Sequence, residues 1–266
     1  MNRNDDFRKV LILGVSITAA TKAEVLAWIE ECVGMKHKIM VVTPNPEQIM
    51  LAQKDGSFRE ILNQASLALC DGEGLRWAAR FLEVQPPIPE RVTGEDVMNA
   101  LLERAQTKGW RVMLMGGRGD TAFRAAEIIQ NLKLKMKNYS SKFKIKGIEG
   151  MKDIQHSNPG ENRRVIREIN TFRPDLLFVA FGAPWQEKWL AQNFEKLDIQ
   201  VGMVVGGALD MIVNPSLRPP DFMTSFGLDW MYRLLRQPWR LWRQIALLRF
   251  ILLAVKTRLL RCIPSV

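Results

Sequence analysis

The chain has 266 residues, of which 47% are hydrophobic, and a formal net charge of +10. This length suits one α/β domain with an appendage, and the apolar content is sufficient for a core without covalent staples. Three widely spaced cysteines without a CxxC pair, and only two histidines, argue against a disulfide framework, a zinc site or a Ser-His catalytic pair. We therefore expect a reducing compartment, no bound metal and no cofactor.

No export or membrane-spanning segment is visible. Residues Met1 to Lys9 are polar and lack the basic start and apolar run of a signal peptide. The longest apolar stretch, Ile245 to Val255, is interrupted by Arg249, whereas a spanning helix needs about 20 predominantly apolar residues. We expect a cytoplasmic protein.

Short apolar runs alternate with helical periodicity along the chain. The predicted strands are Val10–Val15, Ile39–Thr43, Ser66–Cys70, Arg111–Met115, Leu176–Phe181 and Met203–Val205. The predicted helices are Lys22–Val33, Pro46–Gln53, Gly74–Phe81, Glu95–Lys108, Asp120–Leu132, Asn162–Phe172 and Trp185–Phe194. The Lys-rich stretch Lys133–Lys146 is interpreted as a solvated helix end and surface connection. Alternation of this kind predicts an α/β fold: a mainly parallel sheet with helices on both faces.

Polar or glycine-rich turns follow five of these strands. Ligands of such sheets bind beyond the carboxyl ends of the strands, so we expect these turns to form one site on a single edge. The turns begin at Thr43, Asp71, Gly116, Gly182 and Gly206.

Two of the turns carry glycine pairs. Gly116-Gly117 opens a helix, where backbone N–H groups favour a phosphate, although an ordinary tight turn explains the pair equally well. The spacing matches neither GxGxxG nor GxxxxGK[ST], which argues against a nicotinamide cofactor or an ATP-type loop. Gly206-Gly207 is a second such turn, and two of them suit a diphosphate.

Three polar residues have alternative interpretations. Asp71 can act as a general base on a hydroxyl, but its spacing favours an N-cap for the next helix. Gln186, in the first turn of a helix, offers a donor and an acceptor to a sugar or phosphate oxygen. Arg91 lies in a proline-bordered loop, where it is either a phosphate clamp or a surface charge.

The C-terminal segment concentrates the positive charge, because no acidic residue follows Asp229. Four arginines recur there at helical spacing among Trp, Tyr and Leu: Arg233, Arg236, Arg240 and Arg243. This pattern is typical of an interfacial helix that meets anionic lipid headgroups. An oligomer interface and a nucleic-acid patch are the alternatives.

Eight segments together give the chain a specific resemblance, which extends from about residue 10 to 255. They are Thr43–Glu47, Asp71–Leu75, Arg91–Asp96, Met115–Gly117, Phe181–Trp189, Val205–Asp210, Arg218–Pro220 and Gly227–Leu235. In content, order and spacing they resemble the WecG/TagA/CpsF family of bacterial glycosyltransferases. The resemblance implies a Rossmann-like core over residues 1–215 and a membrane-docking appendage over residues 216–266.

The resemblance also implies an activity. Family members transfer an N-acetylmannosamine-type hexosamine from a UDP donor to a polyprenyl-diphosphate-linked sugar, with inversion and without a metal, for teichoic acid, common antigen or exopolysaccharide. By this likeness the partners are the UDP-sugar, the lipid-linked acceptor and the inner leaflet of the cell membrane. A nicotinamide-dependent oxidoreductase and a non-enzymatic nucleic-acid-binding protein are the rival hypotheses. No nucleic-acid partner is expected, and a homo-oligomer stays open.

By the same likeness Asp71 becomes the general base. Thr43, Asn45, Arg91 and Gln186 would line the pocket, and Asp210 would hydrogen-bond the uracil. The remaining substrate-binding candidates are Gly116, Gly117, Gly182, Gly206, Gly207 and Arg218. Met151 departs from the family pattern, because an aromatic residue that could stack on the base usually follows the glycine at Gly150.

Overall fold

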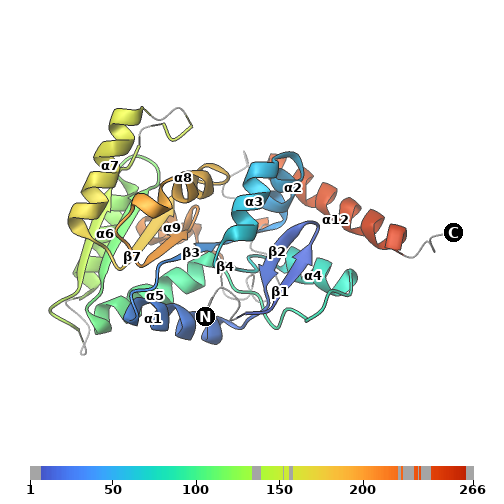
Figure 1. Cartoon of the computed structure of the whole chain (residues 1–266), viewed down its shortest axis with the longest axis horizontal. Helices are drawn as coiled ribbons and strands as arrows, with labels where there is room; N and C mark the ends of the chain where they lie inside the picture. The colour runs from blue at the N-terminus through green and yellow to red at the C-terminus, as the bar shows by residue number, and fades with distance from the viewer. Residues whose placement is uncertain are drawn as a thin grey trace.

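The protein is described by a computed structural model over residues 7–133, 139–151, 153–155, 158–220, 223, 231–232, 234 and 241–261. Within these residues the main sheet has six parallel strands in the order β4-β3-β8-β7-β5-β6 (Figure 1). Their bounds are β3 Ile39–Val42, β4 Leu67–Ala68, β5 Arg111–Gly116, β6 Lys144–Ile148, β7 Leu176–Ala180 and β8 Val201–Val204. The predicted α/β fold class is confirmed.

Helices cover both faces of this sheet. One face packs against α1 (Lys22–Gly34), α5 (Gly94–Lys108), α6 (Thr121–Lys133) and α9 (Ala208–Val213). The other packs against α2 (Pro46–Lys54), α3 (Gly56–Gln64), α4 (Glu73–Phe81), α7 (Pro159–Phe172), α8 (Trp185–Asn193) and α12 (Leu241–Arg261). Successive strand residues point to opposite faces, so Val41 enters the first apolar cluster and Val42 the second. The short 3-10 turns η2 (Phe194–Lys196) and η3 (Pro215–Leu217) complete the described elements.

The first predicted strand, Val10–Val15, is wrong as a strand of the main sheet. The structure has an antiparallel hairpin instead, β1 (Lys9–Ile12) paired with β2 (Val15–Thr18). Leu13 and Gly14 connect the strands with φ of 48° and 84°. Two positive φ values are what a tight two-residue hairpin turn requires. Leucine rarely adopts this conformation, so the sequence carried little local signal for the turn.

A second correction concerns the Lys-rich stretch Lys133–Lys146. The last residues of this stretch, from Lys144 on, belong to β6. This strand pairs in parallel with β5 along its full length: Lys144 is opposite Arg111, and Ile148 is opposite Met115. β6 is the last strand at its side of the sheet. Lysines are common on such edge strands because they discourage pairing with another chain, and here they concealed the strand.

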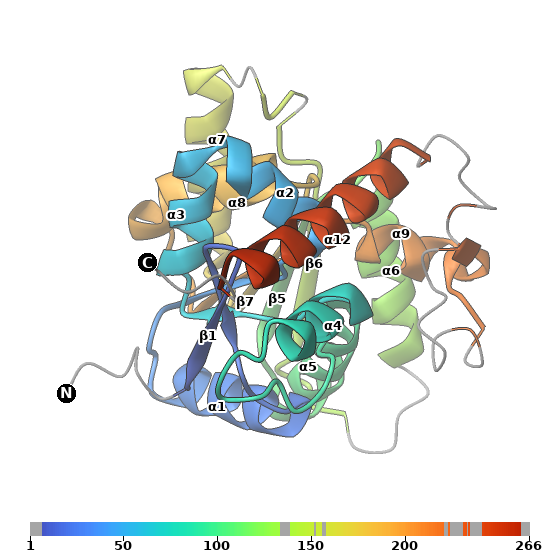
Figure 2. The ribbon, with the colours of Figure 1, turned by 90° about the vertical axis from the view of Figure 1, so that its right-hand side faces the viewer.

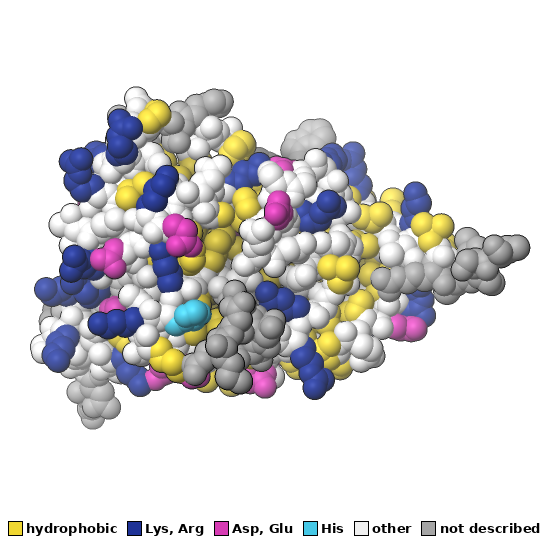
Figure 3. All heavy atoms as spheres, viewed as in Figure 1, with side chains coloured by type: hydrophobic (Ala, Val, Ile, Leu, Met, Phe, Trp, Pro, Cys, Tyr) yellow, Lys and Arg dark blue, Asp and Glu magenta, His cyan; other side chains and the backbone are white. Residues whose placement is uncertain are grey.

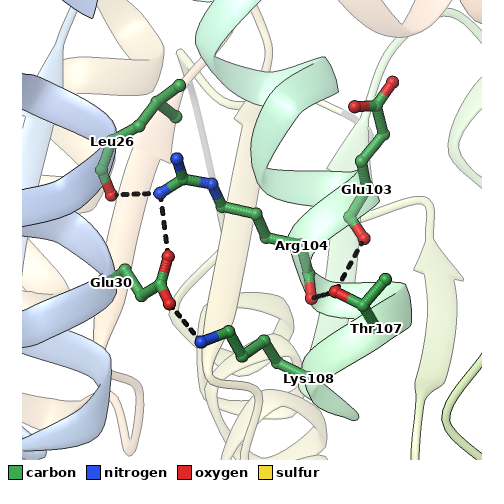
Figure 4. Close-up of polar contacts among 6 residues, drawn as sticks. All are labelled: Leu26, Glu30, Glu103, Arg104, Thr107 and Lys108. Carbon is green, nitrogen blue, oxygen red and sulfur yellow. Dashed lines mark hydrogen bonds and ion pairs between the residues drawn. The ribbon is translucent and has the colours of Figure 1, made fainter. Parts of the chain in front are cut away.

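The contact between α1 and α5 fixes one helical layer. Nη1 of Arg104 donates to the Leu26 carbonyl at 2.7 Å and to Oε2 of Glu30 at 2.9 Å, while Lys108 pairs with the same carboxylate (Figure 4). The hydrogen bond from Lys108 is the main cause that lowers the pKa of Glu30. These bonds hold α5 in place, and the first residues of α5 lie at the candidate site.

The last described helix, α12, packs against α2 and α4 and crosses the face that is turned to the viewer in Figure 2. Phe250 and Ala254 on its inner side are fully buried. No described helix is long and apolar enough to cross a membrane. The division into residues 1–215 and 216–266 stays a prediction, but α12 contributes to the core.

Candidate functional site

All five predicted turns lie at one edge of the sheet, because the strands that precede them are parallel. Neighbouring strands are about 4.8 Å apart, so the turn of Asp71 is roughly 10 Å from that of Gly206, two strands away. The turn of Gly117, four strands away, is roughly 19 Å distant by the same spacing. A ligand that bridges Asp71 and the glycine turns therefore has to lie along this edge.

Asp71 and Thr43 converge on the first residue of α5. Oδ2 of Asp71 lies 3.5 Å from the backbone nitrogen of Gly94. A Cβ atom on Gly94 would lie 2.8 Å from Cγ2 of Thr43, so glycine permits this close approach. The N-terminus of a helix carries partial positive charge, which stabilises an ionised carboxylate placed there.

The N-cap interpretation of Asp71 is wrong. α4 begins after Gly72, which adopts a φ of 120°, and no side chain caps it. The backbone nitrogen of Asp71 instead donates to the carbonyl of Pro44 at 3.1 Å, which joins the turns after β3 and β4. The carboxylate is thereby directed to the start of α5.

Asn45 and Arg91 lie in the two loops next to Asp71. Oδ1 of Asn45 accepts a 3.0 Å hydrogen bond from the Gln48 nitrogen and caps α2. Val92 donates to the Cys70 carbonyl at 3.1 Å, which places the loop of Arg91 beside the end of β4. Both sequence candidates therefore lie around Asp71, and Asn45 has a structural task as well.

The charges near Asp71 influence the buried thiol of Cys70. Burial, followed by the negative charge of Asp71, raises the pKa of Cys70 to about 12, while the positive charges of Arg76 and Arg91 oppose this rise. Arg76, which was not among the residues predicted from the sequence, thus belongs to the same electrostatic environment, and it pairs with Glu73 at 3.1 Å. Its position five residues after Asp71, in the helix that follows, was the available signal.

Gln186 is buried and joins the turns after β7 and β8 by hydrogen bonds. Its side chain is only 1% exposed, and its Oε1 accepts from the backbone nitrogens of Gly182 at 3.1 Å and Gly206 at 3.2 Å. Its Nε2 donates to Oε1 of Glu187 at 2.9 Å. The amide oxygen and one amide N–H of Gln186, both expected from the sequence to contact a substrate, are thus engaged within the protein.

The glycine turns differ in how much room they leave. The N–H groups of Gly117, Gly182 and Gly206 all donate within the protein, Gly117 to the Ala180 carbonyl at 2.7 Å. A Cβ atom on Gly116 or Gly117 would collide with Ala180 or Thr121. On Gly182 or Gly206 it would meet no described atom within 4 Å. Among the described residues, the ends of β7 and β8 therefore leave room beside Gly182 and Gly206.

Asp210 and Arg218 contact different helices at this edge of the sheet. Oδ1 of Asp210, in the first turn of α9, accepts from Thr121 at 3.4 Å. Arg218 forms a 3.0 Å ion pair with Glu95, directly after Gly94, which brings it to the start of α5. Gly207 precedes α9 and is exposed. Met151 is 3% exposed and packs in the core, so it offers little surface to a ligand.

The four arginines of the predicted membrane segment cannot be placed in the site. Arg233, Arg236 and Arg240 lie outside the described residues. Arg243 belongs to α12, but its side chain is also outside the described part.

A parallel sheet with carboxylate, amide and arginine side chains gathered at its carboxyl edge defines an α/β enzyme that binds its ligand along that edge. The sequence model described as the Glycosyl transferase WecG/TagA/CpsF family matches residues 10–262. The chain belongs to this family, as the resemblance of its motifs indicated, and it is a glycosyltransferase.

Relatives from Staphylococcus aureus match over almost the whole chain. A protein from Staphylococcus aureus strain MW2, named N-acetylglucosaminyldiphosphoundecaprenol N-acetyl-beta-D-mannosaminyltransferase, is 26% identical over 91% of this chain and 89% of its own length. Its counterpart in strain MRSA252 is 28% identical over the same shares. The rival interpretations as an oxidoreductase or a nucleic-acid-binding protein are set aside by the family membership.

Proposed function

We propose that this enzyme transfers an N-acetylmannosamine-type sugar from a UDP donor to a polyprenyl-diphosphate-linked sugar, with inversion and without a metal ion, in the synthesis of a cell-surface polysaccharide or teichoic acid. The relatives named above support the donor sugar and the acceptor by their names. The observation that carries the proposal is the position of Asp71, whose carboxylate faces the start of α5 beside Thr43. In the proposed reaction this carboxylate faces the incoming acceptor alcohol.

The donor is proposed to lie along the edge of the sheet with its sugar toward Asp71. The open space at Gly182 and Gly206 supports this placement of the sugar and diphosphate. The uracil then reaches Asp210, which lies farther along the edge on α9 and already accepts from Thr121. Because three glycine N–H groups are engaged within the protein, arginine side chains are better candidates than these N–H groups to offset the diphosphate charge. Arg91 and Arg218 are two such candidates among the described residues.

The proposed chemistry is a single displacement. Asp71 accepts the proton of the acceptor hydroxyl as that oxygen attacks the anomeric carbon of the donor. The bond between the anomeric carbon and the β-phosphate oxygen breaks on the opposite face, so the configuration inverts and UDP leaves as an anion. Gln186 is proposed to act from behind, by holding the turns of Gly182 and Gly206 in place.

The outer side of α12 is proposed to contact the inner leaflet of the cell membrane, where a polyprenyl-linked acceptor is found. The exposed apolar side chains Ile245, Leu248, Leu252 and Leu259 are spaced so that they share one side of the helix. Leu248 and Leu252 are 62% and 69% exposed. Arg249 and Lys256 are exposed beside them, and hydrophobic and basic side chains are both visible over α12 in Figure 3. This combination favours an anionic lipid surface.

A donor screen tests the proposed function. The purified full chain is incubated with an N-acetylglucosaminyl-diphosphate acceptor on a short polyprenyl chain and with UDP-N-acetylmannosamine, UDP-N-acetylglucosamine, UDP-glucose or the uronic acid donor, with and without EDTA. We expect transfer from an N-acetylmannosamine-type donor, unchanged by EDTA, and a product of inverted anomeric configuration. Transfer from none of the four, under conditions where a characterised relative is active, would overturn the proposal.

A further inference from the structure

Three helices meet at Gly74, three residues after Asp71 in the chain. Gly74 lies in the first turn of α4, and a Cβ atom built on it would be 2.7 Å from Cγ of Pro46 and 3.6 Å from Cδ1 of Leu247. Pro46 is the first residue of α2, and Leu247 lies on α12. The starts of α2 and α4 are therefore in close contact, with a leucine of α12 beside that contact.

The same two helix starts carry the loops of the candidate site. Asn45 immediately precedes α2, and Asp71 precedes the Gly72 N-cap of α4. The hydrogen bond from the Asp71 nitrogen to the Pro44 carbonyl joins these loops at the level of the backbone. A shift of α4 against α2 would therefore move Asp71 relative to the loop of Thr43 and Asn45.

α12 is attached to α4 at both ends of that helix. Leu247 lies at the start, whereas at the other end Arg258 donates to the Phe81 carbonyl, pairs with Glu83 at 2.5 Å and lies 4.9 Å from the Phe81 ring centre. Figure 2 shows α12 running between α2 and α4, and it contacts both helices. Between these attachments the fully buried Phe250 enters the core. These contacts hold α12 against α4 and the core, and its exposed leucines lie on the outer side.

We propose that Leu247 is a positioning residue for Asp71: by packing on the contact between Pro46 and Gly74, it sets the distance between the loop of Asp71 and the loop of Thr43 and Asn45. The inference rests on the proposed function, in which Asp71 is the base. It assigns the inner side of α12 to the geometry of the reaction and leaves lipid contact to the outer side. A displacement of about 1 Å at a reacting group can cost roughly 100-fold in rate.

The test separates positioning from stability in a detergent-free assay with a water-soluble short-chain acceptor, so that membrane binding does not contribute. We expect Leu247→Ala to lower kcat about 10- to 100-fold with KM for the donor and calorimetric UDP affinity unchanged, and Leu247→Met to restore most of kcat. Ile251→Ala is the matched control, because Ile251 lies one turn later and packs against the same apolar cluster. It should lose a similar amount of stability but keep kcat within about twofold.

Two outcomes would overturn the inference: normal kcat in Leu247→Ala, or an equal loss of kcat in Leu247→Ala and Ile251→Ala. If Leu247→Ala does not fold, Gly74→Ala serves as a second variant. It disturbs the same contact from the side of α4, because its added Cβ presses on Pro46. That variant should then show the same selective loss of kcat, and a normal kcat would again contradict the inference. An inactive wild-type chain in the donor screen would instead refute the proposed function itself.

Discussion

Gln186 and Glu187 form a side-chain pair buried behind the site, in which Nε2 of Gln186 donates to Oε1 of Glu187 at 2.9 Å. The same Gln186 side chain accepts the N–H groups of Gly182 and Gly206, so the pair links α8 to the turns after β7 and β8. Within the described residues, Oε2 of Glu187 has no hydrogen-bond partner. Burial raises the pKa of Glu187 from its ordinary 4.5 to about 7.

The raised pKa of Glu187 predicts a pH-dependent stability. Below pH 4.5 the carboxyl is protonated in both states; between 4.5 and 7 the folded state keeps the proton that the unfolded state loses. The free energy of unfolding should thus fall as pH rises through this window, by about 3 kcal/mol in all. Urea unfolding from pH 4.5 to 8 should show this fall in the wild type and in Glu127→Gln, an exposed control on α6, but not in Glu187→Gln. Parallel curves for all three proteins would refute the assignment.

Gln186→Ala should destabilise the protein and slow the reaction. The change removes the oxygen that accepts hydrogen bonds from two turn N–H groups. The free energy of unfolding should fall by about 2 kcal/mol, because leaving a buried donor without a partner costs roughly 1–3 kcal/mol. The loosened turns should also lower kcat at least about tenfold. Gln192→Ala, an exposed change on the same helix, is the control. Wild-type kcat in Gln186→Ala, measured at a temperature where it is folded, would argue against the positioning role.

Asp210→Ala should weaken donor binding and leave the chemical step intact. A hydrogen bond to a charged group contributes about 1.5–3 kcal/mol, so the Kd for UDP should rise about 10- to 100-fold. Thr121→Val, which removes the hydroxyl that contacts Asp210, should produce a smaller rise. Titration calorimetry with UDP measures both. An unchanged Kd in Asp210→Ala would remove this residue from the uracil site.

Membrane binding should depend on the outer leucines of α12. The double variant Leu248→Ser and Leu252→Ser should lose most of its binding to vesicles that contain anionic phospholipid, and the wild type should bind neutral vesicles weakly. Leu132→Ser is the matched control, since Leu132 is 53% exposed on α6, a different helix. Equal vesicle binding by the double variant and this control would contradict the proposal. Point changes are preferable to deletion here, because truncation would also remove the buried Phe250.

The sequence predicted the arrangement of the sheet better than the contacts of the site. Runs such as Leu176–Ala180 are buried on both sides, and their apolar composition alone indicates a central parallel strand. β6 escaped notice because lysines at an edge carry no apolar signal. The role of Gln186 was equally hidden, because its partners Gly182 and Gly206 meet only when two separate strand ends adjoin. The sequence alone allowed Asp71 to be interpreted as an N-cap. In the structure Gly72 occupies the N-cap position of α4, and no side chain caps this helix.

In the proposed reaction Asp71 is the base that activates the acceptor alcohol. The most direct measurement is kcat for sugar transfer by Asp71→Asn, with Asp120→Asn as a charge-matched control at an exposed position on the same edge. We expect a kcat about 10²–10⁴-fold below that of the wild type, with calorimetric affinity for the UDP-sugar unchanged and with Asp120→Asn near normal. Near-wild-type turnover by a folded, donor-binding Asp71→Asn variant would contradict it.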